Sequence, residues 1–241
     1  MAGLPITLVA LAAGIAWLIL AFSWRALTTN PRGDVETGVA WHAMRLYVRL
    51  VHRLRVEGLE NIPAWLPGEP PPGPLVVVAN HTAGIDPLLI QSCCVFEIRW
   101  MMLSSMMVPG FDPLWRWIDS IPVGGTVPGS QSARAGIKHL QDGGVLGIFP
   151  EGGIERPSQT ILPFEPGVGL LISKTDARVL PIIVDGTPYA PSAFGSLIRR
   201  SRSRLRFLPI RSFAGGGRGA KQIVDDLRST FLTETGWPAS S

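Results

Sequence analysis

The sequence contains few charged residues and very little cysteine. Asp, Glu, Lys and Arg make up only 17% of its 241 residues, whereas 46% are hydrophobic, a balance typical of proteins that contact lipid. The two cysteines, Cys93 and Cys94, are neighbours, and adjacent cysteines rarely form a structural disulfide or a metal site. We therefore expect both to be core residues in a reducing compartment, and we expect no metal site.

Lysine is nearly absent as well. Only Lys138, Lys174 and Lys221 are present, so the formal net charge of +4 comes almost entirely from arginine. Arginine suits phosphate groups and anionic lipid surfaces. Because neither a zinc-finger spacing nor an RNA-binding signature accompanies it, the sequence argues against a nucleic-acid partner. One dense cluster is either a solvated face or a surface for an acidic carrier protein, coenzyme A phosphates or anionic lipid: Arg199, Arg200, Arg202, Arg204 and Arg206.

Charge is missing altogether from residues 1–24, and residues 4–22 are almost wholly apolar, long enough to span a bilayer as a helix. No basic residue precedes this run and no clear cleavage site follows it, which disfavours a signal peptide. Arg25 and Arg32 flank it on the C-terminal side, so the positive-inside rule places the rest of the chain in the cytoplasm. We predict an anchor helix within residues 1–30 that holds the protein in the cell membrane, either across the bilayer or at its interface.

The following segment, residues 31–63, predicts an amphipathic helix over residues 34–55 and a first strand over residues 55–57. Along that helix, three arginines four residues apart would form a basic row suited either to anionic headgroups or to solvent: Arg45, Arg49 and Arg53. Residues 64–74 read AWLPGEPPPGP, which predicts a rigid, turn-rich connector.

In the remainder, residues 75–241, short apolar runs alternate with helical patterns. This alternation predicts an α/β domain with a largely parallel sheet flanked by helices, in which ligands bind at the carboxyl ends of the strands. A segment after the first of these strands is unusually rich in methionine and tryptophan, and it can line an acyl-chain groove, contact the membrane or form ordinary core. The expected strands are residues 75–78, 145–149 and 179–184, and the expected helices include residues 132–141 and 168–173.

Residues 75–90 hold the most informative pattern. A buried strand ends at Asn80 and His81, a short turn follows, and Asp86 stands directly before Pro87, the expected N-cap and first residue of a helix. A strand, a tight turn and a helix would bring the imidazole and the carboxylate together. The imidazole can take a proton from a hydroxyl at neutral pH, and the carboxylate can fix its tautomer. The alternative is that one residue is only a turn residue and the other only a cap.

Four motifs, in this order, resemble the glycerolipid acyltransferase family, whose best-known members are the 1-acylglycerol-3-phosphate acyltransferases: VEGLENIP at 56–63, NHTAGID at 80–86, FPEG at 149–152 and VLPIIVDGT at 179–187. The likeness runs from about Val56 to Ile210. It implies a glycerol-phosphate acyltransferase-like fold with the acyltransferase domain at residues 75–241. It also implies transfer of a fatty acyl group from acyl-CoA or acyl carrier protein to a hydroxyl of lysophosphatidate or a related lyso-lipid, in phospholipid biosynthesis and without a cofactor.

The resemblance also implies roles for individual residues. His81 would deprotonate the acceptor hydroxyl while Asp86 holds the imidazole, and the alkoxide would attack the thioester directly. The absence of a G-x-S-x-G elbow agrees with a reaction that forms no covalent enzyme intermediate. The residues implied or considered for substrate binding are Asn80, Phe149, Pro150, Glu151 and Gly152, with Arg156 and Arg134 as further candidates.

The chain departs from the family pattern at three positions where family members carry a cation for phosphate. Residues 101–107 hold only Met, Leu and Ser where a lysine is usual, Gly124 and Gly125 stand where an arginine is usual, and Gly153-Ile154 follows the FPEG motif where Thr-Arg is common. Arg156 can compensate by a two-residue shift. The open alternatives are an acceptor without phosphate, a lipid hydrolase, and a lipid-binding protein without turnover. Other cations that can reach the site from elsewhere are Arg99, Arg134 and Lys138.

Overall fold

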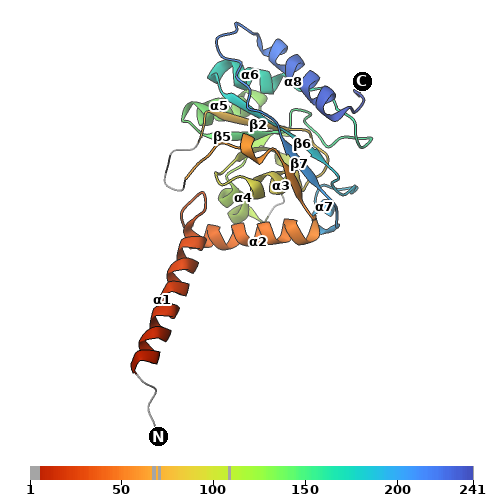
Figure 1. Ribbon diagram of the computed structural model, residues 1–241. Coiled ribbons are helices and arrows are strands. Elements are labelled where there is room, and N and C mark those ends of the chain that lie inside the picture. The colour runs from red at the N-terminus through yellow and green to blue at the C-terminus, as the bar shows by residue number, and fades with distance from the viewer. Residues whose placement is uncertain (1–5, 67–68, 70–71, 108–109, 241) are drawn as a thin grey trace.

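The structure is a computed structural model that describes residues 6–66, 69, 72–107 and 110–240. Parts of the predicted anchor and of the predicted proline-rich connector therefore lie outside the described residues. The described part forms an α/β domain from which one N-terminal helix projects (Figure 1).

Within these residues, seven strands form one sheet in the order β1-β7-β6-β2-β5-β3-β4. Every neighbouring pair is parallel except β6 and β7, which confirms the predicted fold class. Strand β1 comes from the segment that precedes the connector, yet it pairs with β7 at the edge of the same sheet. The strands are β1 Arg55–Glu57, β2 Leu75–Ala79, β3 Arg99–Leu103, β4 Ile121–Val123, β5 Val145–Ile148, β6 Arg178–Asp185 and β7 Arg204–Phe207.

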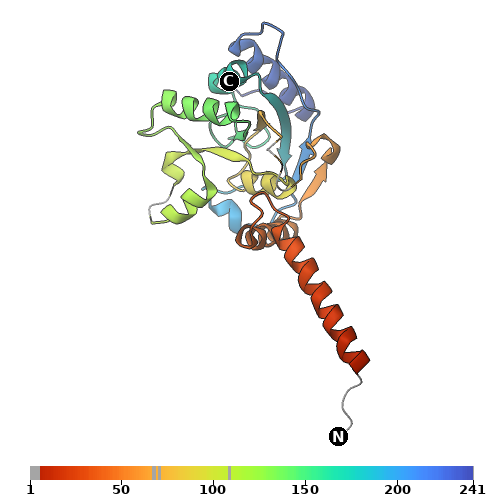
Figure 2. The same ribbon diagram turned by 90° about the vertical axis from the view of Figure 1, so that its left-hand side faces the viewer.

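Helices cover both faces of the sheet, as Figures 1 and 2 show. Helices α5, α6 and α8 pack on one face, and α3 and α2 lie on the other. The helices are α1 Ile6–Thr28, α2 Val35–Val51, η1 Leu59–Asn61, α3 Asp86–Cys93, η2 Ser104–Met106, α4 Asp112–Ile118, α5 Gly129–Gln141, α6 Pro166–Thr175, α7 Gly195–Ile198 and α8 Ala220–Thr235.

Strand β2 is the central strand of the fold, and all five of its residues are buried. Side chains alternate along a strand, so Val76 and Val78 enter the core under α5, α6 and α8, while Leu75 and Val77 enter the core under α3. Burial of each such side chain stabilises the fold by about 1.5–3 kcal/mol. Because both faces hold it, the carboxyl end of β2 is a rigid support for the residues that follow.

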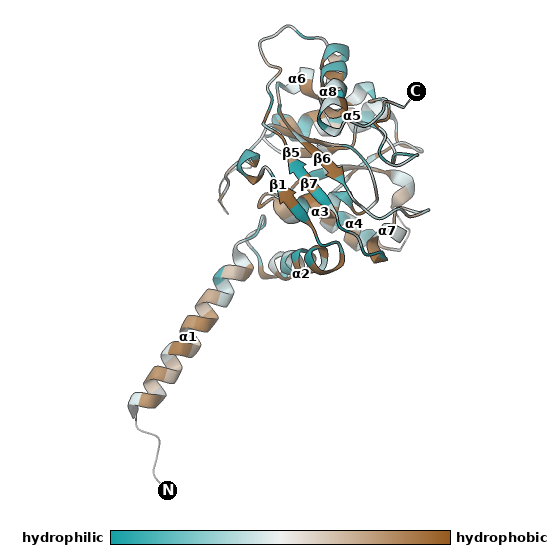
Figure 3. Ribbon diagram, turned by 45° about the vertical axis from the view of Figure 1, so that its right-hand side comes forward, coloured by the Kyte–Doolittle hydropathy of each residue, from teal (hydrophilic) through white to brown (hydrophobic). Residues whose placement is uncertain are grey.

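Helix α1 projects away from the domain, and its hydrophobic residues are exposed (Figure 3). Among the described residues, Ala10–Thr28 is the stretch of helix long and apolar enough to cross a membrane. The Asn30 side-chain amide joins this helix to α2, since its Nδ2 donates to the carbonyl oxygens of Leu27 and Asp34 at 2.7 and 2.6 Å.

Helix α2 is shorter than the sequence predicts. It ends at Val51 because His52 is buried and its ring nitrogens lie 3.0 Å from the Tyr47 hydroxyl and 2.8 Å from the Ser201 hydroxyl. Arg53 then adopts a φ of 43°, which turns the chain into β1. The expected row of three arginines four residues apart is therefore broken, since its last member lies outside the helix.

Helix α3 begins differently from the prediction. The sequence places Asp86 at the N-cap, whereas Ile85 is the N-cap and Asp86 is the first helical residue. Its carboxylate faces back to the turn that precedes the helix rather than forward to the helix's own amides. Asp86 is therefore a partner of the turn, and the strand-turn-helix prediction holds with a shift of one residue.

The C-terminal residues make more contacts with the domain than the sequence predicts. The sequence predicts a frayed end from Trp237 onward, but Ser240 N donates to Ile161 O at 3.0 Å and Trp237 packs against the core.

Of the arginine cluster, Arg206 pairs with Glu234 at 2.7 Å and Arg204 lies 4.0 Å from Glu57. Of the five arginines, Arg204 and Arg206 lie on β7, which begins at residue 204.

Gly147 on β5 is predicted to resist substitution. A Cβ at this position would lie 2.4 Å from the Trp100 ring and 2.7 Å from Ile98 Cγ2, so Gly147→Ala should lower the free energy of unfolding by roughly 1–3 kcal/mol. A Cβ at Gly167 in α6 meets nothing within 4 Å, so Gly167→Ala should change stability by less than about 1 kcal/mol. Denaturant unfolding of both variants in detergent tests the difference, and equal stabilities would contradict it.

Candidate active site

The carboxyl end of β2 brings His81 and Asp86 together. Their side chains are joined by a contact of 3.0 Å between His81 Nδ1 and Asp86 Oδ2, across the turn between β2 and α3. The Asp86 side chain is fully buried, whereas 18% of the His81 side chain is exposed. Because a carboxylate only accepts hydrogen bonds, it selects the imidazole tautomer with the proton on Nδ1 and leaves Nε2 as the basic nitrogen.

The turn itself stabilises the buried carboxylate. Thr82 N and Ala83 N donate to Asp86 Oδ2 at 2.7 and 2.9 Å, and Thr82 Oγ1 donates to Oδ1 at 3.1 Å. A negative charge in the first turn of α3 is also favoured by the helix dipole. The buried anion therefore has its hydrogen bonds satisfied by the residues that directly precede it.

The imidazole is also held by aromatic stacking. Phe149 lies almost parallel to the His81 ring, with centroids 4.1 Å apart and an angle of 18°, and Trp100 stacks on Phe149 at 5.1 Å and 13°. Phe149 follows β5 and Trp100 lies on β3, so two neighbouring strands fix the plane of the ring. The first residue of the FPEG motif thus contacts the histidine directly.

Glu151, the third residue of that motif, supports the same turn. Its Oε1 accepts from His81 N at 3.2 Å and its Oε2 from Leu162 N at 3.3 Å, and burial raises the pKa of this carboxyl to about 8. Glu155 N donates to His81 O at 2.8 Å, so the backbone of the histidine is held on both sides. Both carboxylate oxygens of Glu151 are engaged inside the protein, which differs from the contact with the acceptor that the resemblance implies.

Asn80 has a similar supporting position. It is fully buried, and its side-chain amide pairs with the backbone of Val184 on β6, through Nδ2 to O at 2.9 Å and Oδ1 from N at 2.8 Å. These two hydrogen bonds extend the pairing of β2 with β6 beyond the end of the strand. Asn80 therefore fixes the point from which the His81 turn departs, and it is not among the residues that line the cleft described next.

A large cleft with a volume of about 1170 Å³ opens beside His81. The methionine- and tryptophan-rich segment lines much of it, through Trp100, Met101, Met102, Met106 and Trp115. Of the readings that the sequence left open for this segment, lining an apolar groove agrees with these contacts. Other site residues also line the cleft: Phe149, Pro150, Gly152 and Arg156.

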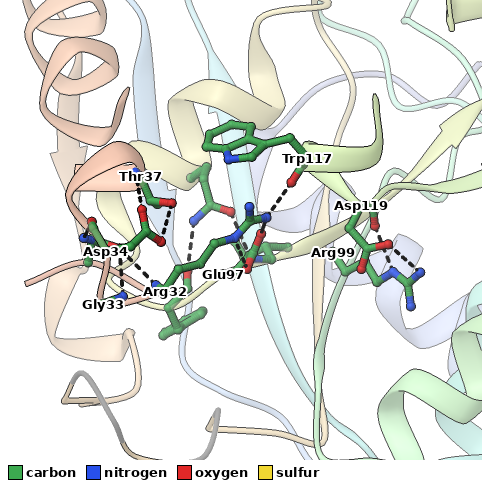
Figure 4. Close-up of polar contacts among 12 residues, drawn as sticks. Arg32, Gly33, Asp34, Thr37, Glu97, Arg99, Trp117 and Asp119 are labelled. Atoms are coloured by element: carbon green, nitrogen blue, oxygen red, sulfur yellow. Dashed lines mark hydrogen bonds and ion pairs between the residues drawn. The ribbon is translucent and has the colours of Figure 1, made fainter. Parts of the chain in front are cut away.

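Two arginines line the large cleft among the described residues. Arg32 is paired with Glu97 and donates to Trp117 O, as Figure 4 shows. Arg156 donates to the carbonyl oxygens of Glu155 and Ala190 at 2.6 and 2.9 Å and lies over the ring of Tyr189.

The other candidate cations lie elsewhere. Arg134 is exposed on α5 and does not line the cleft, and Lys138 pairs with Asp142 at 2.9 Å on the same helix. Arg99 is held by Asp119 at 2.9 Å (Figure 4). Of the cations considered from the sequence, Arg156 is the one that the fold brings to the cleft.

The cysteines follow the prediction that they are core residues. Cys94 is fully buried and Cys93 is partly buried on α3. Burial raises the pKa of both thiols, that of Cys93 to about 11, so neither is a thiolate at neutral pH. His81 and Asp86 thus remain the candidate reactive pair beside the cleft.

Together, these observations define a class of protein: an α/β enzyme with a histidine–aspartate pair at the carboxyl edge of a mainly parallel sheet, opening onto an apolar cleft. The chain belongs to the Acyltransferase family, because the sequence model of that family matches residues 53–185, more than half of the chain. It is therefore an acyltransferase, and the family resemblance seen in the motifs is confirmed.

Two relatives accompany this match. The chain is 24% identical over 170 residues to the 1-acyl-sn-glycerol-3-phosphate acyltransferase of Bacillus subtilis (strain 168), an alignment that covers 68% of this chain and 76% of the relative. Its fold resembles the crystal structure of the 1-acyl-sn-glycerophosphate acyltransferase PlsC from Thermotoga maritima. That comparison gives a TM-score of 0.65 at 19% identity and covers 84% of this chain and 82% of the other.

Sequence reasoning missed three neighbours of His81. The sequence marks Thr82 only as part of the turn and Trp100 only as part of an apolar segment, and it gives no signal for Glu155. A hydroxyl directly after the histidine is a weak signal for a carboxylate partner. The positions of the other two depend on strands and loops that are distant in the sequence, so no local signal marks them.

Burial of Glu151 and Glu155 predicts a pH-dependent stability. Their pKa values are raised by burial to about 8 and about 7, so the folded protein binds protons more tightly than the unfolded chain. The free energy of unfolding should therefore fall as the pH rises from about 4.5 to about 8, by at most about 1.4 kcal/mol per pH unit for one group.

Thermal or denaturant unfolding in detergent between pH 5 and pH 8 tests this expectation. Glu151→Gln should flatten the slope up to pH 8, whereas Glu155→Gln should flatten it mainly below pH 7. Glu60→Gln, a change at an exposed position in η1, is the control and should leave the slope unchanged. If the pH dependence of stability is unaltered in Glu151→Gln, the raised pKa does not belong to Glu151.

Proposed function

We propose that the chain is a membrane-bound O-acyltransferase that moves a fatty acyl group from acyl-CoA or acyl carrier protein to the hydroxyl of a lyso-lipid in phospholipid biosynthesis. The observation that carries this proposal is the contact between His81 Nδ1 and Asp86 beside a large apolar cleft. The names of the relatives from Bacillus subtilis and Thermotoga maritima agree with lysophosphatidate or a related lyso-lipid as the acceptor. The reaction as proposed needs no cofactor.

In the proposed mechanism, His81 acts as the general base. Its Nε2 takes the proton of the acceptor hydroxyl, and Asp86 stabilises the imidazolium that forms. The alkoxide oxygen attacks the carbonyl carbon of the thioester and forms a tetrahedral intermediate. When the carbon–sulfur bond breaks, the leaving thiolate takes the proton from Nε2, and the imidazole returns to its starting form.

The stack of Trp100 and Phe149 against His81 supports this role for the imidazole. A general base must keep its basic nitrogen within about 3 Å of the oxygen whose proton it removes. Rotation of the ring would therefore slow the reaction. The stack opposes such rotation from one side, and the hydrogen bond to Asp86 opposes it at Nδ1. The apolar lining of the cleft supports its use as the site of the acyl chain.

Recognition of the acceptor is proposed to involve Arg156. The three cations that family members use for phosphate are absent from this chain, and Arg156 lines the cleft next to the loop that holds His81. Two of its N–H groups are used by carbonyl oxygens, which orients the guanidinium and leaves other N–H groups for an anionic oxygen. This single cation is proposed to replace the missing set.

Membrane attachment is proposed to occur through α1. Its exposed apolar surface and its length support an anchor, and Arg25 and Arg32 at its C-terminal side favour a catalytic domain on the cytoplasmic side. Lyso-lipids remain in the membrane, so an anchored domain would keep the cleft near its substrate.

His81→Ala is expected to lower acyl transfer by at least about 100-fold while the protein keeps its fold, because general-base catalysis contributes roughly 10²–10⁴-fold. The measurement is mass spectrometry of the products formed from mixed lyso-lipids and acyl thioesters. His42→Ala is the matched control, since His42 is exposed on α2. Full activity in His81→Ala would refute the proposal. Free fatty acid without acylated lipid would indicate a hydrolase, and lipid binding without turnover would indicate a binding protein.

Arg156→Gln is expected to raise the KM for lysophosphatidate by about tenfold, because it removes a charge-assisted hydrogen bond worth roughly 1.5–3 kcal/mol. The KM for a monoacylglycerol, which lacks phosphate, should change little. Lys138→Gln on α5 serves as the control, because its ammonium lies away from the cleft. A parallel rise for both acceptors would show that Arg156 only supports the loop.

A further inference from the structure

The two oxygens of the Asp86 carboxylate are held unequally. Oδ2 accepts from His81 Nδ1 at 3.0 Å, from Thr82 N at 2.7 Å and from Ala83 N at 2.9 Å. Oδ1 accepts from the Thr82 hydroxyl at 3.1 Å, and the described residues supply it with no other donor. Because the terminal torsion of a carboxylate is only weakly restricted by itself, the Thr82 hydroxyl contributes directly to the plane in which this carboxylate lies.

The Thr82 hydroxyl has two acceptors within reach. Its Oγ1 lies 3.1 Å from Asp86 Oδ1 and 3.3 Å from Oδ2, and a hydroxyl carries a single proton. If that proton pointed to Oδ2, it would compete with the imidazole N–H for the same oxygen, and Oδ1 would stay buried without a donor. The direction of this one proton therefore affects how firmly His81 is held.

Thr187 restricts the Thr82 hydroxyl from outside the turn. Its Oγ1 lies 2.7 Å from Thr82 Oγ1. A hydrogen bond to a carboxylate is stronger than one between two neutral groups, so the Thr82 hydroxyl donates to Asp86 and accepts from Thr187. A hydroxyl that accepts a hydrogen bond directs its own proton away from the incoming donor, and Thr187 thus limits the rotation of the Thr82 proton.

Thr187 reaches this place because β2 and β6 are neighbours in the sheet. Asn80, directly after β2, pairs with Val184 near the end of β6. Gly186 then adopts a φ of 68°, and a Cβ there would lie 2.4 Å from the carbonyl oxygen of Arg202, so this position requires glycine. The bend at Gly186 brings Thr187, the last residue of the motif VLPIIVDGT, against the turn after β2.

Thr187 lies outside the large cleft. Together with Thr82 it lines a small polar cavity of about 140 Å³, and the two cavities share no lining residue. A change at Thr187 should therefore leave the walls of the cleft intact. One water molecule requires roughly 10–15 Å³, so water can enter the small cavity and accept the proton of a Thr82 hydroxyl that Thr187 no longer orients.

We propose that Thr187 is a positioning residue for acyl transfer, which acts through the Thr82 hydroxyl to hold the Asp86 carboxylate in the orientation that His81 needs. Among the described residues, the Thr187 side chain bonds to Thr82 alone, so its effect reaches the imidazole through one hydroxyl. The consequence for the reaction rests on the proposed function, whereas the effect on the carboxylate and the imidazole does not. A kinetic test and a spectroscopic test separate the two.

The kinetic test compares Thr187→Val, which removes the hydroxyl and keeps the shape of the side chain, with Thr187→Ser, which keeps the hydroxyl. Thr187→Val should lower kcat about three- to tenfold, as expected for the loss of one neutral hydrogen bond, and should leave the KM for the acyl donor and for the lyso-lipid unchanged. Thr187→Ser should retain most of the activity.

Thr175→Val is the matched control for this test. The Thr175 hydroxyl also makes a hydrogen bond of 2.7 Å in a partly buried position, but it does so within α6, to the carbonyl oxygen of Leu171. The same chemical change at this site should leave kcat unaltered. Thermal melts of the purified full chain in detergent show that each variant is folded, and Thr187→Ala replaces Thr187→Val in the comparison if the latter does not fold.

A double-mutant cycle tests the route through Thr82. Thr82→Val removes the hydroxyl that bonds to Asp86 and keeps the backbone donor, so it should lower kcat at least as much as Thr187→Val does. In the Thr82→Val background, Thr187→Val should have no further effect, because the hydroxyl through which it acts is gone. An equal fall in both backgrounds overturns the proposal, and so does a raised KM with an unchanged kcat.

The spectroscopic test does not depend on turnover. A proton held between His81 Nδ1 and a buried carboxylate is shielded from exchange with water, and its signal in proton NMR is identified by its loss in His81→Ala. Thr187→Val should shift or broaden this signal in the full chain in detergent. Thr187→Ser and Thr175→Val should leave it in place.

In a chain that catalyses acyl transfer, an unaltered kcat or an unaltered imidazole signal in Thr187→Val overturns the proposal. A Thr187→Ser variant that loses as much activity as Thr187→Val overturns it as well, because the packing of the side chain and not its hydroxyl would then be responsible. A chain that shows the change in the signal but catalyses no acyl transfer refutes the proposed function and leaves the positioning of Asp86 by Thr187 intact.

Discussion

The burial of one carboxylate is the constraint on which the site depends. Asp86 has no contact with solvent, so its charge must be satisfied by the protein. The donors come from residues 80–85, which join β2 to α3, and they include the imidazole of His81. The shape of the turn, the tautomer of the histidine and the direction of its free nitrogen all follow from that requirement. Removing the carboxylate would therefore disturb the turn as well as the imidazole.

One loop distant in the sequence, residues 149–155, contacts the same histidine at three points. Glu151 accepts from its backbone N–H, Glu155 donates to its carbonyl oxygen, and Phe149 stacks on its ring. The FPEG loop is thus a support for the turn that carries His81. Because a buried carboxyl performs part of this support, the geometry of the site and the stability of the fold share a dependence on pH.

Charge is divided between the two cavities by a single peptide segment. Arg156 lines the large apolar cleft, and Glu155, its neighbour in the chain, lines the small polar cavity behind the catalytic turn. The turn shows the same division, since His81 lines one cavity and Thr82 the other.

Local patterns in the sequence were sufficient for the class of the sheet, for strands β1, β2, β5 and β6, for several helices and for the pair of His81 and Asp86. Apolar runs and cap signals depend on neighbouring residues, and the two side chains are only five residues apart. The same patterns failed at the end of α2, where His52 is buried against Ser201, and at the C-terminus, where Ser240 bonds to Ile161. These features depend on partners that lie far away in the chain.

The sequence by itself determined the fold class, the strand-turn-helix unit and the identity of the two residues at its centre, because each depends on the order of nearby residues. Only the tertiary structure decided what surrounds them. The stack of Trp100 and Phe149, the inward direction of Glu151 and the unpaired oxygen of Glu155 arise where the ends of separate strands meet. Sheet order brings those ends together, and short-range periodicity carries no information about which distant side chains will share a cavity.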